Sequence, residues 1–373
     1  MKVYFTASTT GNGKYQPQYQ KVINLIEKLG HQLISGEQII KKNFLSQDQK
    51  LTKEQIFSRQ KQRIEQSDCV IAEVTSPSHG VGGEIAYALI QEKPALSLFY
   101  KNSEDKLSPM IAGNPSDNLY LEHYDDNLKI ILKDFLVHVQ SSKQRKGRLI
   151  VIEGGDGSGK TTQASLLVKL FKEQGKKVKY MDFPRYYSSF HGKIVGDFLA
   201  GKFGKLNEVS PYLISLAYAL DRASAKEEME EWLGQGGIIV SNRYATSNMA
   251  HQTARLPQKE KDKFLEWLDR LEYRVHKIPR PDLIIYLYVP WKIGMELTAK
   301  KIDKRRYIKG MDIAEADIKH RQESEKMYLY LAKNKRKWIK IDCTENNKIL
   351  PKEKIHEMIV ETLKKKRVMS NGQ

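Results

Sequence analysis

The sequence predicts two α/β domains, each built on a parallel β-sheet covered by helices. Both halves of the chain alternate short apolar β-branched runs with amphipathic helical patterns, and this alternation is typical of parallel sheets with crossover helices. Residues 141–147 between the halves are polar and lack periodicity, so we place a linker there. The prediction is one domain over 1–140 and a second over 148–373, each long enough for a buried core.

Charge is distributed unevenly between the two halves. The net charge is +18, yet residues 1–142 hold equal numbers of basic and acidic side chains, so the excess lies in the C-terminal half. Its basic clusters, such as 333–340 and 364–367, contain no recognised nucleic-acid motif. We interpret them as a solvated surface that attracts nucleotide polyanions, and we expect no specific nucleic acid partner.

The chain also lacks the marks of a membrane or secreted protein. No apolar run is long enough to span a bilayer, and the N-terminus begins directly with a strand-like segment. Cys69 and Cys343 each lie in an apolar strand-like stretch, where we expect core thiols rather than a disulfide or a metal site. We therefore expect a cytoplasmic protein.

A phosphate-binding loop opens the C-terminal half. Residues 154–161 match G-x-x-x-x-G-K-[ST], follow an apolar run at 149–152 and precede a helical pattern that ends at Gly175. Lys160 can reach the β and γ phosphates, and the Thr161 hydroxyl can ligate Mg²⁺. The residues that we expect to bind ATP are Gly154, Gly155, Asp156, Gly157, Ser158, Gly159, Lys160, Thr161 and Thr162.

Polar groups suited to a phosphate acceptor follow this loop along the chain. Phe183 and Arg185 come after a strand at 178–181, where ligands bind in such sheets. Tyr218 and Arg222 share one face of a helical run because they are spaced i, i+4. Further candidates are Asn242, Arg243 and Tyr244 after a strand at 238–240, and Arg305 and Arg306 in a basic loop before a helix near Asp312.

These motifs, in this order from about 148 to 366, closely resemble thymidylate kinase. The resemblance implies that Arg185 and Arg243 hold the acceptor phosphate, that Tyr218 stacks on thymine and that Arg222 bonds the edge of the base. It also implies that Asp156 faces the acceptor sugar, and that Arg305 and Arg306 belong to a lid over ATP. Phe183, Gln252 and the preceding His251 match the family's acceptor segments. The implied catalytic groups are Lys160, Arg243, Arg305 and Arg306, with Mg²⁺ and ATP as cofactor and phosphoryl donor.

One residue departs from the kinase pattern. Asn242 stands where many members carry Asp, which removes a candidate carboxylate for orienting Mg²⁺-bound water or a base. Glu153 and Asp156 are the candidates to cover that role. The chemistry expected is in-line phosphoryl transfer, in which positioning and charge neutralisation supply the rate.

A candidate nucleophile lies in the N-terminal half. A buried strand at 69–74 leads into the loop Ser-Pro-Ser-His-Gly, and a helix is predicted to start near Gly82. Glu84 would then lie in the first turn, where the helix dipole keeps a carboxylate ionised. A carboxylate over a Gly-rich pocket can act as a nucleophile. The alternative is an ordinary glutamate at a helix N-terminus.

This half resembles the nucleoside 2-deoxyribosyltransferase superfamily over residues 2–138, and most of all its 2′-deoxynucleoside 5′-monophosphate N-hydrolases. The resemblance rests on the opening Tyr-Phe-Thr-Ala-Ser and on the segment 68–88. It implies that Glu84 attacks C1′ of deoxyribose, with Ser8, Ser78 and Ser108 for the phosphate and Ser108 given across a homodimer interface. The implied nucleotide-binding set is Tyr4, Ser8, Gln60, Ser78, Gly80, Gly82, Glu84 and Ser108.

Two departures affect the N-terminal half. Thr10 replaces the family's phosphate-binding Arg, and Gln60 replaces an Asp that contacts the sugar or assists departure of the base. Glutamine cannot act as an acid. We predict a fusion that phosphorylates dTMP and hydrolyses the N-glycosidic bond of a 2′-deoxynucleoside 5′-monophosphate. The alternatives for the N-terminal half are a base-exchanging deoxyribosyltransferase and a nucleotide-binding sensor that regulates the kinase.

Overall fold

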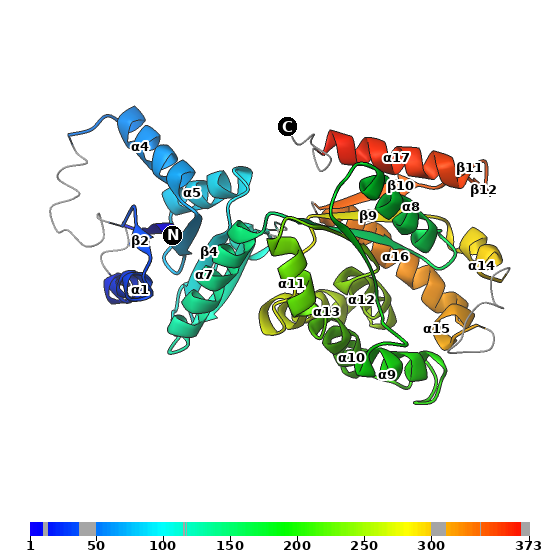
Figure 1. The fold of residues 1–373 in the computed structure, drawn as a ribbon. Helices are drawn as coiled ribbons and strands as arrows, with labels where there is room; N and C mark the ends of the chain where they lie inside the picture. Colours follow the sequence, from blue (N-terminus) through cyan, green and yellow to red (C-terminus); the bar gives the residue numbers. More distant parts are fainter. Residues whose placement is uncertain are drawn as a thin grey trace. The chain divides into compact units, whose positions relative to one another are not determined.

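The chain folds into two compact units, Met1–Gln144 and Arg145–Gln373 (Figure 1). The computed structural model describes residues 1–9, 14–36, 50–114, 116, 118–299, 311–335 and 337–366. Among these described residues, no helix is long and apolar enough to cross a membrane.

The predicted linker at 141–147 is partly wrong, because its first four residues continue a helix that ends at Gln144. Ser, Lys and Gln are compatible with a helix, so polarity alone did not mark the boundary. Two of the remaining three residues are hydrogen-bonded within the second unit. Arg145 donates to the carbonyl of Arg280 at 2.7 Å, and the Gly147 amide donates to the carbonyl of Leu233 at 2.8 Å.

The N-terminal unit is a five-stranded parallel sheet in the order β2-β1-β3-β4-β5. Its elements are β1 (Lys2–Ala7), α1 (Gln16–Lys28), β2 (Gln32–Leu33), α4 (Lys53–Gln66), β3 (Cys69–Glu73), α5 (His79–Ile90), β4 (Ala95–Tyr100), α6 (Pro109–Ala112), β5 (Leu119–Tyr124) and α7 (Leu128–Gln144).

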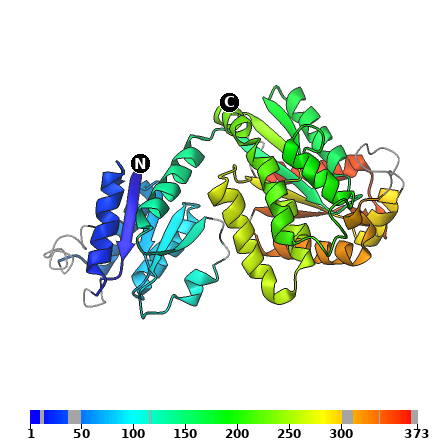
Figure 2. The same cartoon turned by 90° about the horizontal axis from the view of Figure 1, so that it is seen from below.

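Alternation along the strands divides the core of this unit between two faces of the sheet. Val3 and Phe5 pack with α1 and α7, which lie side by side (Figure 2). Tyr4, between them in sequence, points to the opposite face and packs with α4 and α5. This period of two is what strand geometry dictates, and it places Tyr4 beneath the helix that carries Glu84.

The C-terminal unit contains a second five-stranded parallel sheet, in the order β10-β9-β6-β8-β7. Its elements are β6 (Arg148–Gly154), α8 (Lys160–Glu173), β7 (Val178–Asp182), α9 (Phe190–Leu199), α10 (Pro211–Ala223), α11 (Lys226–Gly234), β8 (Ile238–Asn242), α12 (Ala245–His251), η1 (Thr253–Arg255), α13 (Gln258–Arg270), η2 (Leu271–Val275), β9 (Leu283–Tyr288), α14 (Trp291–Ala299), α15 (Ile313–Ala316), α16 (Ile318–Asn334), β10 (Trp338–Asp342), β11 (Thr344–Glu345), β12 (Lys348–Ile349) and α17 (Lys352–Lys365).

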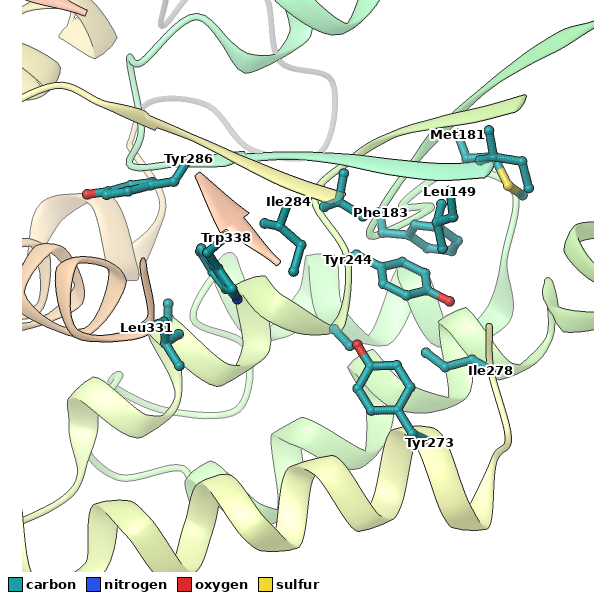
Figure 3. Packing of buried hydrophobic residues seen from close by; sticks show 14 of the residues in the cluster. Leu149, Met181, Phe183, Tyr244, Tyr273, Ile278, Ile284, Tyr286, Leu331 and Trp338 are labelled. Carbon is teal, nitrogen blue, oxygen red and sulfur yellow. The ribbon is translucent and has the colours of Figure 1, made fainter. Parts of the chain in front are cut away.

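Helices cover both faces of this second sheet. Ile150 and Ile152 face α8 and α17, whereas Leu149 and Val151 face the layer that includes α11, α12 and α16 (Figure 1). The second layer is rich in aromatic side chains, and Phe183 meets Tyr244 edge to face at a ring separation of 5.8 Å (Figure 3). The fold class predicted from the sequence, two parallel-sheet α/β domains, is confirmed.

Candidate nucleotide sites

The phosphate-binding loop joins β6 to α8 and is built on left-handed glycines. Gly157 has φ +84° and Gly159 has φ +87°. A Cβ on Gly157 would lie 2.2 Å from the carbonyl oxygen of Gly294 in α14, so only glycine fits there. Backbone N–H groups at such a turn and at the N-terminus of α8 form a site for phosphate oxygens.

Lys160 is buried at the base of this loop. Its Nζ donates to the carbonyl oxygens of Gly154 at 2.9 Å and Gly155 at 2.7 Å. Burial and the nearby Arg243 lower its pKa to about 7, against the opposing effect of Asp156. An incoming phosphate anion would raise this pKa again, so the ammonium is placed to bind one.

A cavity lies beside the loop and collects the predicted acceptor residues. It is lined by Asp156, Phe183, Tyr218, Arg222, Arg243 and Gln252, of which Tyr218 and Arg222 lie on the same helix, α10. Arg185 is not part of this lining. Its amide donates to Asp221 Oδ2 at 2.9 Å and its Nε to Asp221 Oδ1 at 3.1 Å, so α10 holds it.

Arg243 and Asp156 form an ion pair at this cavity. Arg243 has φ +62°, which is strained for a non-glycine residue and is typical of functional positions. Its Nη2 donates to Asp156, and its Nη1 lies 3.2 Å from His251 Nε2. Burial alone would raise the pKa of Asp156, but Arg243 and Lys160 hold it far below its usual range. Asp156 is therefore ionised at neutral pH.

The buried carboxylate of Glu153 fixes the turn that carries Arg243. It accepts from the Tyr244 amide at 3.2 Å, from Ser247 Oγ at 2.7 Å and from the Tyr328 hydroxyl at 2.9 Å. Because these donors surround it, Glu153 holds the loop between β8 and α12.

Arg222 has a partner that sequence analysis missed. The guanidinium is buried and donates through Nε to Glu272 Oε2 at 3.2 Å and through Nη2 to Glu272 Oε1. Glu272 belongs to η2, a π-helical turn more than forty residues downstream. No local signal in the sequence links the two residues.

Asn248 and His320 also line the cavity and were not predicted. Asn248 lies four residues before Gln252 on α12, so helical spacing could have identified it. His320 Nε2 lies 3.3 Å from His251 Nδ1. Burial lowers the pKa of His320 to about 4 and holds that of His251 well below its usual range, so both rings are neutral at neutral pH.

The end of β8 lies next to Thr161. Asn242 Nδ2 donates to Thr161 Oγ1 at 3.2 Å and to Asp182 Oδ1 at 2.9 Å. Asn242 Oδ1 is buried and meets no hydrogen-bond donor within the described part of the chain. Oxygen donors of this kind suit Mg²⁺, which also takes ligands from nucleotide phosphates. Among all residues that the structure describes, no group of three or more His, Cys, Asp or Glu side chains is arranged to hold a metal ion.

The predicted lid lies outside the described residues, because it falls at 300–310 and includes Arg305 and Arg306. α15 begins directly after Asp312, which caps it by accepting from the amides of Ala314 at 3.0 Å and Glu315 at 2.8 Å.

In the N-terminal unit, Tyr4 and Glu84 meet. The Tyr4 hydroxyl donates to Glu84 Oε1 at 2.7 Å. The prediction that the helix starts near Gly82 is wrong, because Ser78 caps α5 and the helix begins at His79. Glu84 is thus beyond the first turn, where the dipole is weaker. Burial raises its pKa, against hydrogen bonds from Thr6 and Tyr4, so the expected dipole-driven ionisation does not dominate.

Two of the predicted serines, Ser78 and Ser108, lie in a cavity apart from Tyr4 and Glu84. Ser78, Gly82 and Ser108 line a cavity between α5 and α6, and neither Tyr4 nor Glu84 lines it. The helical period explains this, since Gly82 and Glu84 point to different sides of α5.

The other residues predicted for this site do not line that cavity. Gly80 lies in the first turn of α5, and Ser8 directly follows β1. Gln60 lies on α4, and its buried Oε1 has no hydrogen-bond partner among the described residues. Thr10 lies outside the described residues.

The architecture of the C-terminal unit is that of a P-loop nucleotide kinase, with a cavity at the carboxyl ends of β6 and β8. The family model described as thymidylate kinase matches residues 152–359, and the one described as nucleoside 2-deoxyribosyltransferase matches residues 3–134. The chain therefore belongs to the thymidylate kinase family and carries an N-terminal domain of the nucleoside 2-deoxyribosyltransferase family.

Individual relatives match one unit each. The thymidylate kinase of Mycobacterium tuberculosis is 32% identical over 184 residues, which are 49% of this chain and 85% of the relative. A protein of Syntrophotalea carbinolica with the name "Putative 2′-deoxynucleoside 5′-phosphate N-hydrolase 1" is 31% identical over 136 residues, 36% of this chain and 94% of the relative. The solved thymidylate kinase of Candida albicans matches with a TM-score of 0.45 and 23% identity, covering 60% of this chain and 93% of its own.

Proposed function

We propose that the C-terminal unit transfers the γ-phosphoryl group of MgATP to the phosphate of dTMP. The observation that carries this proposal is the Arg243–Asp156 pair in a cavity beside the phosphate-binding loop. Relatives named thymidylate kinase support the choice of acceptor.

The chain's own groups would act by positioning and by neutralising charge. Lys160 exchanges the carbonyls of Gly154 and Gly155 for the phosphates of ATP. Arg243 exchanges part of its contact with Asp156 for the acceptor phosphate. An oxygen of that phosphate is already anionic, so it attacks the γ-phosphorus without a strong base. Mg²⁺ held at Thr161 would neutralise charge on the donor phosphates.

We assign recognition of the base to two other residues that line the cavity. Tyr218 offers a ring for stacking, and Arg222 offers N–H donors for a base carbonyl. Because Glu272 neutralises the guanidinium, Arg222 donates a hydrogen bond without presenting net charge to an uncharged base. This suits thymine better than an anionic ligand.

An acceptor panel tests the kinase assignment. We expect dTDP to form from dTMP and ATP with a kcat/KM well above the values for AMP and CMP. Preferential phosphorylation of AMP or CMP would refute the dTMP assignment.

We further propose that the N-terminal unit hydrolyses the N-glycosidic bond of a 2′-deoxynucleoside 5′-monophosphate. The motivating observation is the buried Glu84 that accepts from Tyr4. A Glu84 oxygen attacks C1′, the bond from C1′ to the base breaks, and the bonding electrons leave with the base, which takes a proton from water. A water molecule then attacks C1′ of the deoxyribosyl ester, which releases deoxyribose 5-phosphate and returns Glu84.

Two alternatives differ from this proposal in their products. Resolution of the ester by a second base would make the unit a deoxyribosyltransferase, and binding without turnover would make it a sensor. Mass spectrometry of the intact chain after incubation with a 2-fluoro sugar analogue tests the ester. We expect one added 2-fluoro-2-deoxyribosyl phosphate group in the unmodified chain and none in Glu84→Gln. An adduct that survives Glu84→Gln would contradict this nucleophile.

We propose a homodimer in solution. Leu213 and Leu220 form an exposed apolar stripe on α10, and Phe190 on α9 is 75% exposed. Light scattering should give about twice the chain mass of 43.1 kDa. A single-chain mass at micromolar concentration would refute the dimer.

A further inference from the structure

The two carboxylates that the sequence offers in place of Asn242 are engaged elsewhere. Glu153 accepts from Tyr244, Ser247 and Tyr328, and Asp156 pairs with Arg243. Both therefore serve the acceptor side of the site. The donor side, where Thr161 stands, would lack an anion if no other carboxylate were near.

Asp182 is that carboxylate. It ends β7 and stands directly opposite Asn242 in the register of β7 and β8. Asn242 Nδ2 lies 2.9 Å from Asp182 Oδ1 and 3.2 Å from Thr161 Oγ1, so one amide bridges the two oxygens. Both Asp182 and Thr161 are exposed, whereas Asn242 is buried between them.

The bridging amide gives the arrangement a fixed geometry. Its two N–H groups are used by Asp182 and Thr161, while its buried Oδ1 has no donor within the described residues. Such an oxygen is costly to bury unless a donor or a cation satisfies it on binding. Water bound to a cation is a donor of this kind.

We propose that Asp182, held by Asn242, replaces the missing β8 carboxylate and positions the hydrated cation of MgATP next to Thr161. The negative charge thus comes from Asp182 at the end of β7. Asn242 adds no charge but holds Asp182 and Thr161 in place through its hydrogen bonds. Asp182 is a positioning residue and does not contact the transferred group. This inference rests on the proposed kinase function and assigns the placement of its cation to the pair Asp182 and Asn242.

Exchange of the two side chains provides the test. The full chain is prepared as Asp182→Asn, as Asn242→Asp and as the double variant that carries both changes. Mn²⁺ binding is measured by electron paramagnetic resonance in the presence of ADP, and ADP binding is measured separately in EDTA. We expect Asp182→Asn to weaken Mn²⁺ binding by about 10-fold to 100-fold, the usual effect of losing a group that orients a metal's ligands.

The double variant should restore Mn²⁺ affinity to within a few-fold, because it returns one carboxylate and one amide to the same pair. ADP affinity in EDTA should stay unchanged in Asp182→Asn, since the phosphate-binding loop is intact. Asp342→Asn is the matched control, because Asp342 ends β10 at the far edge of the same sheet and is exposed.

Three results overturn the inference in different ways. Unchanged Mn²⁺ affinity in Asp182→Asn refutes the role of Asp182 alone. Failure of the unmodified chain to bind Mn²⁺ with ADP refutes both this role and the proposed kinase function. Loss of ADP binding in EDTA by Asp182→Asn would show a structural role for this residue and would also refute the proposal.

Discussion

Arg222 is a buried charged side chain that we assign to base recognition, so its burial affects the stability of the fold as well as binding. A guanidinium with 1% exposure keeps its charge, so its burial is costly without a partner, and Glu272 supplies one at 0% exposure. Removal of one member of such a pair leaves the other charge buried, whereas removal of both leaves a packing problem only. Stability and base recognition can therefore be separated at this residue.

Arg222→Ala should lower the free energy of unfolding by about 3–5 kcal/mol, because Glu272 loses its partner. The double change Arg222→Met with Glu272→Leu should recover most of that stability. Both variants should lose about 10-fold or more in kcat/KM for dTMP, since each lacks the hydrogen bond to the base. Thermal unfolding and steady-state kinetics measure the two effects. Full activity in the double variant would contradict recognition by Arg222.

Glu73 makes the stability of the N-terminal unit depend on pH. It is fully buried at the end of β3 and accepts from the Thr75 amide at 3.3 Å and the Tyr124 hydroxyl at 3.1 Å. Burial raises its pKa from 4.5 to about 7, although these hydrogen bonds lower it. The folded chain thus binds a proton more tightly than the unfolded chain does. Its contribution is complete below pH 4.5 and is lost as the pH rises through 7.

Glu73→Gln should flatten that dependence, because the amide does not titrate. Between about pH 5 and pH 8 the unmodified chain should lose on the order of 3 kcal/mol more stability than the variant. Calorimetric unfolding at several pH values measures the difference. Glu104→Gln is the control, since that side chain is 94% exposed. Parallel pH profiles for Glu73→Gln and the unmodified chain would show that Glu73 is ionised throughout.

At the scale of elements, the turn from β6 to α8 depends on close contact with α14. The carbonyl of Gly294 approaches Gly157 where any side chain would stand. Gly157→Ala should therefore displace the loop and weaken ADP binding by at least about 10-fold, or about 1.4 kcal/mol. Isothermal titration with ADP measures this. Gly234→Ala in α11, where the added Cβ meets nothing within 4 Å, should bind ADP normally. Normal binding by Gly157→Ala would show that the loop tolerates the contact.

The sequence predicted which segments are helices and strands better than it predicted the residues at which these elements begin and end. The Ser78 cap sets the start of α5 three residues before Gly82, and the polar end of α7 resembles a linker. In both places a short polar stretch is compatible with either state, and only tertiary contacts decide between them. Because α5 starts earlier than predicted, Glu84 lies beyond the first turn and is buried. Burial raises its pKa, whereas the helix dipole was expected to keep the carboxylate ionised.

For the whole molecule, the order of strands and helices identified two parallel-sheet units. Several of the residues predicted from motifs line one cavity, because these motifs stand at strand ends that a parallel sheet gathers at one edge. Partners from distant elements were not predicted. Glu272 at Arg222, Asp221 at Arg185 and Asp182 at Asn242 depend on packing and register, which local patterns do not encode.

The central claim is that one chain carries two separate nucleotide sites, a kinase site with Lys160 and a glycosidic site with Glu84. The most direct measurement incubates the full chain with ATP, dTMP and a panel of other deoxynucleoside monophosphates, and then separates diphosphates, free bases and deoxyribose 5-phosphate. We predict that Lys160→Ala abolishes dTDP and keeps base release, while Glu84→Gln abolishes base release and keeps dTDP. Formation of dTDP by Lys160→Ala, or loss of both products in either single variant, would contradict the account.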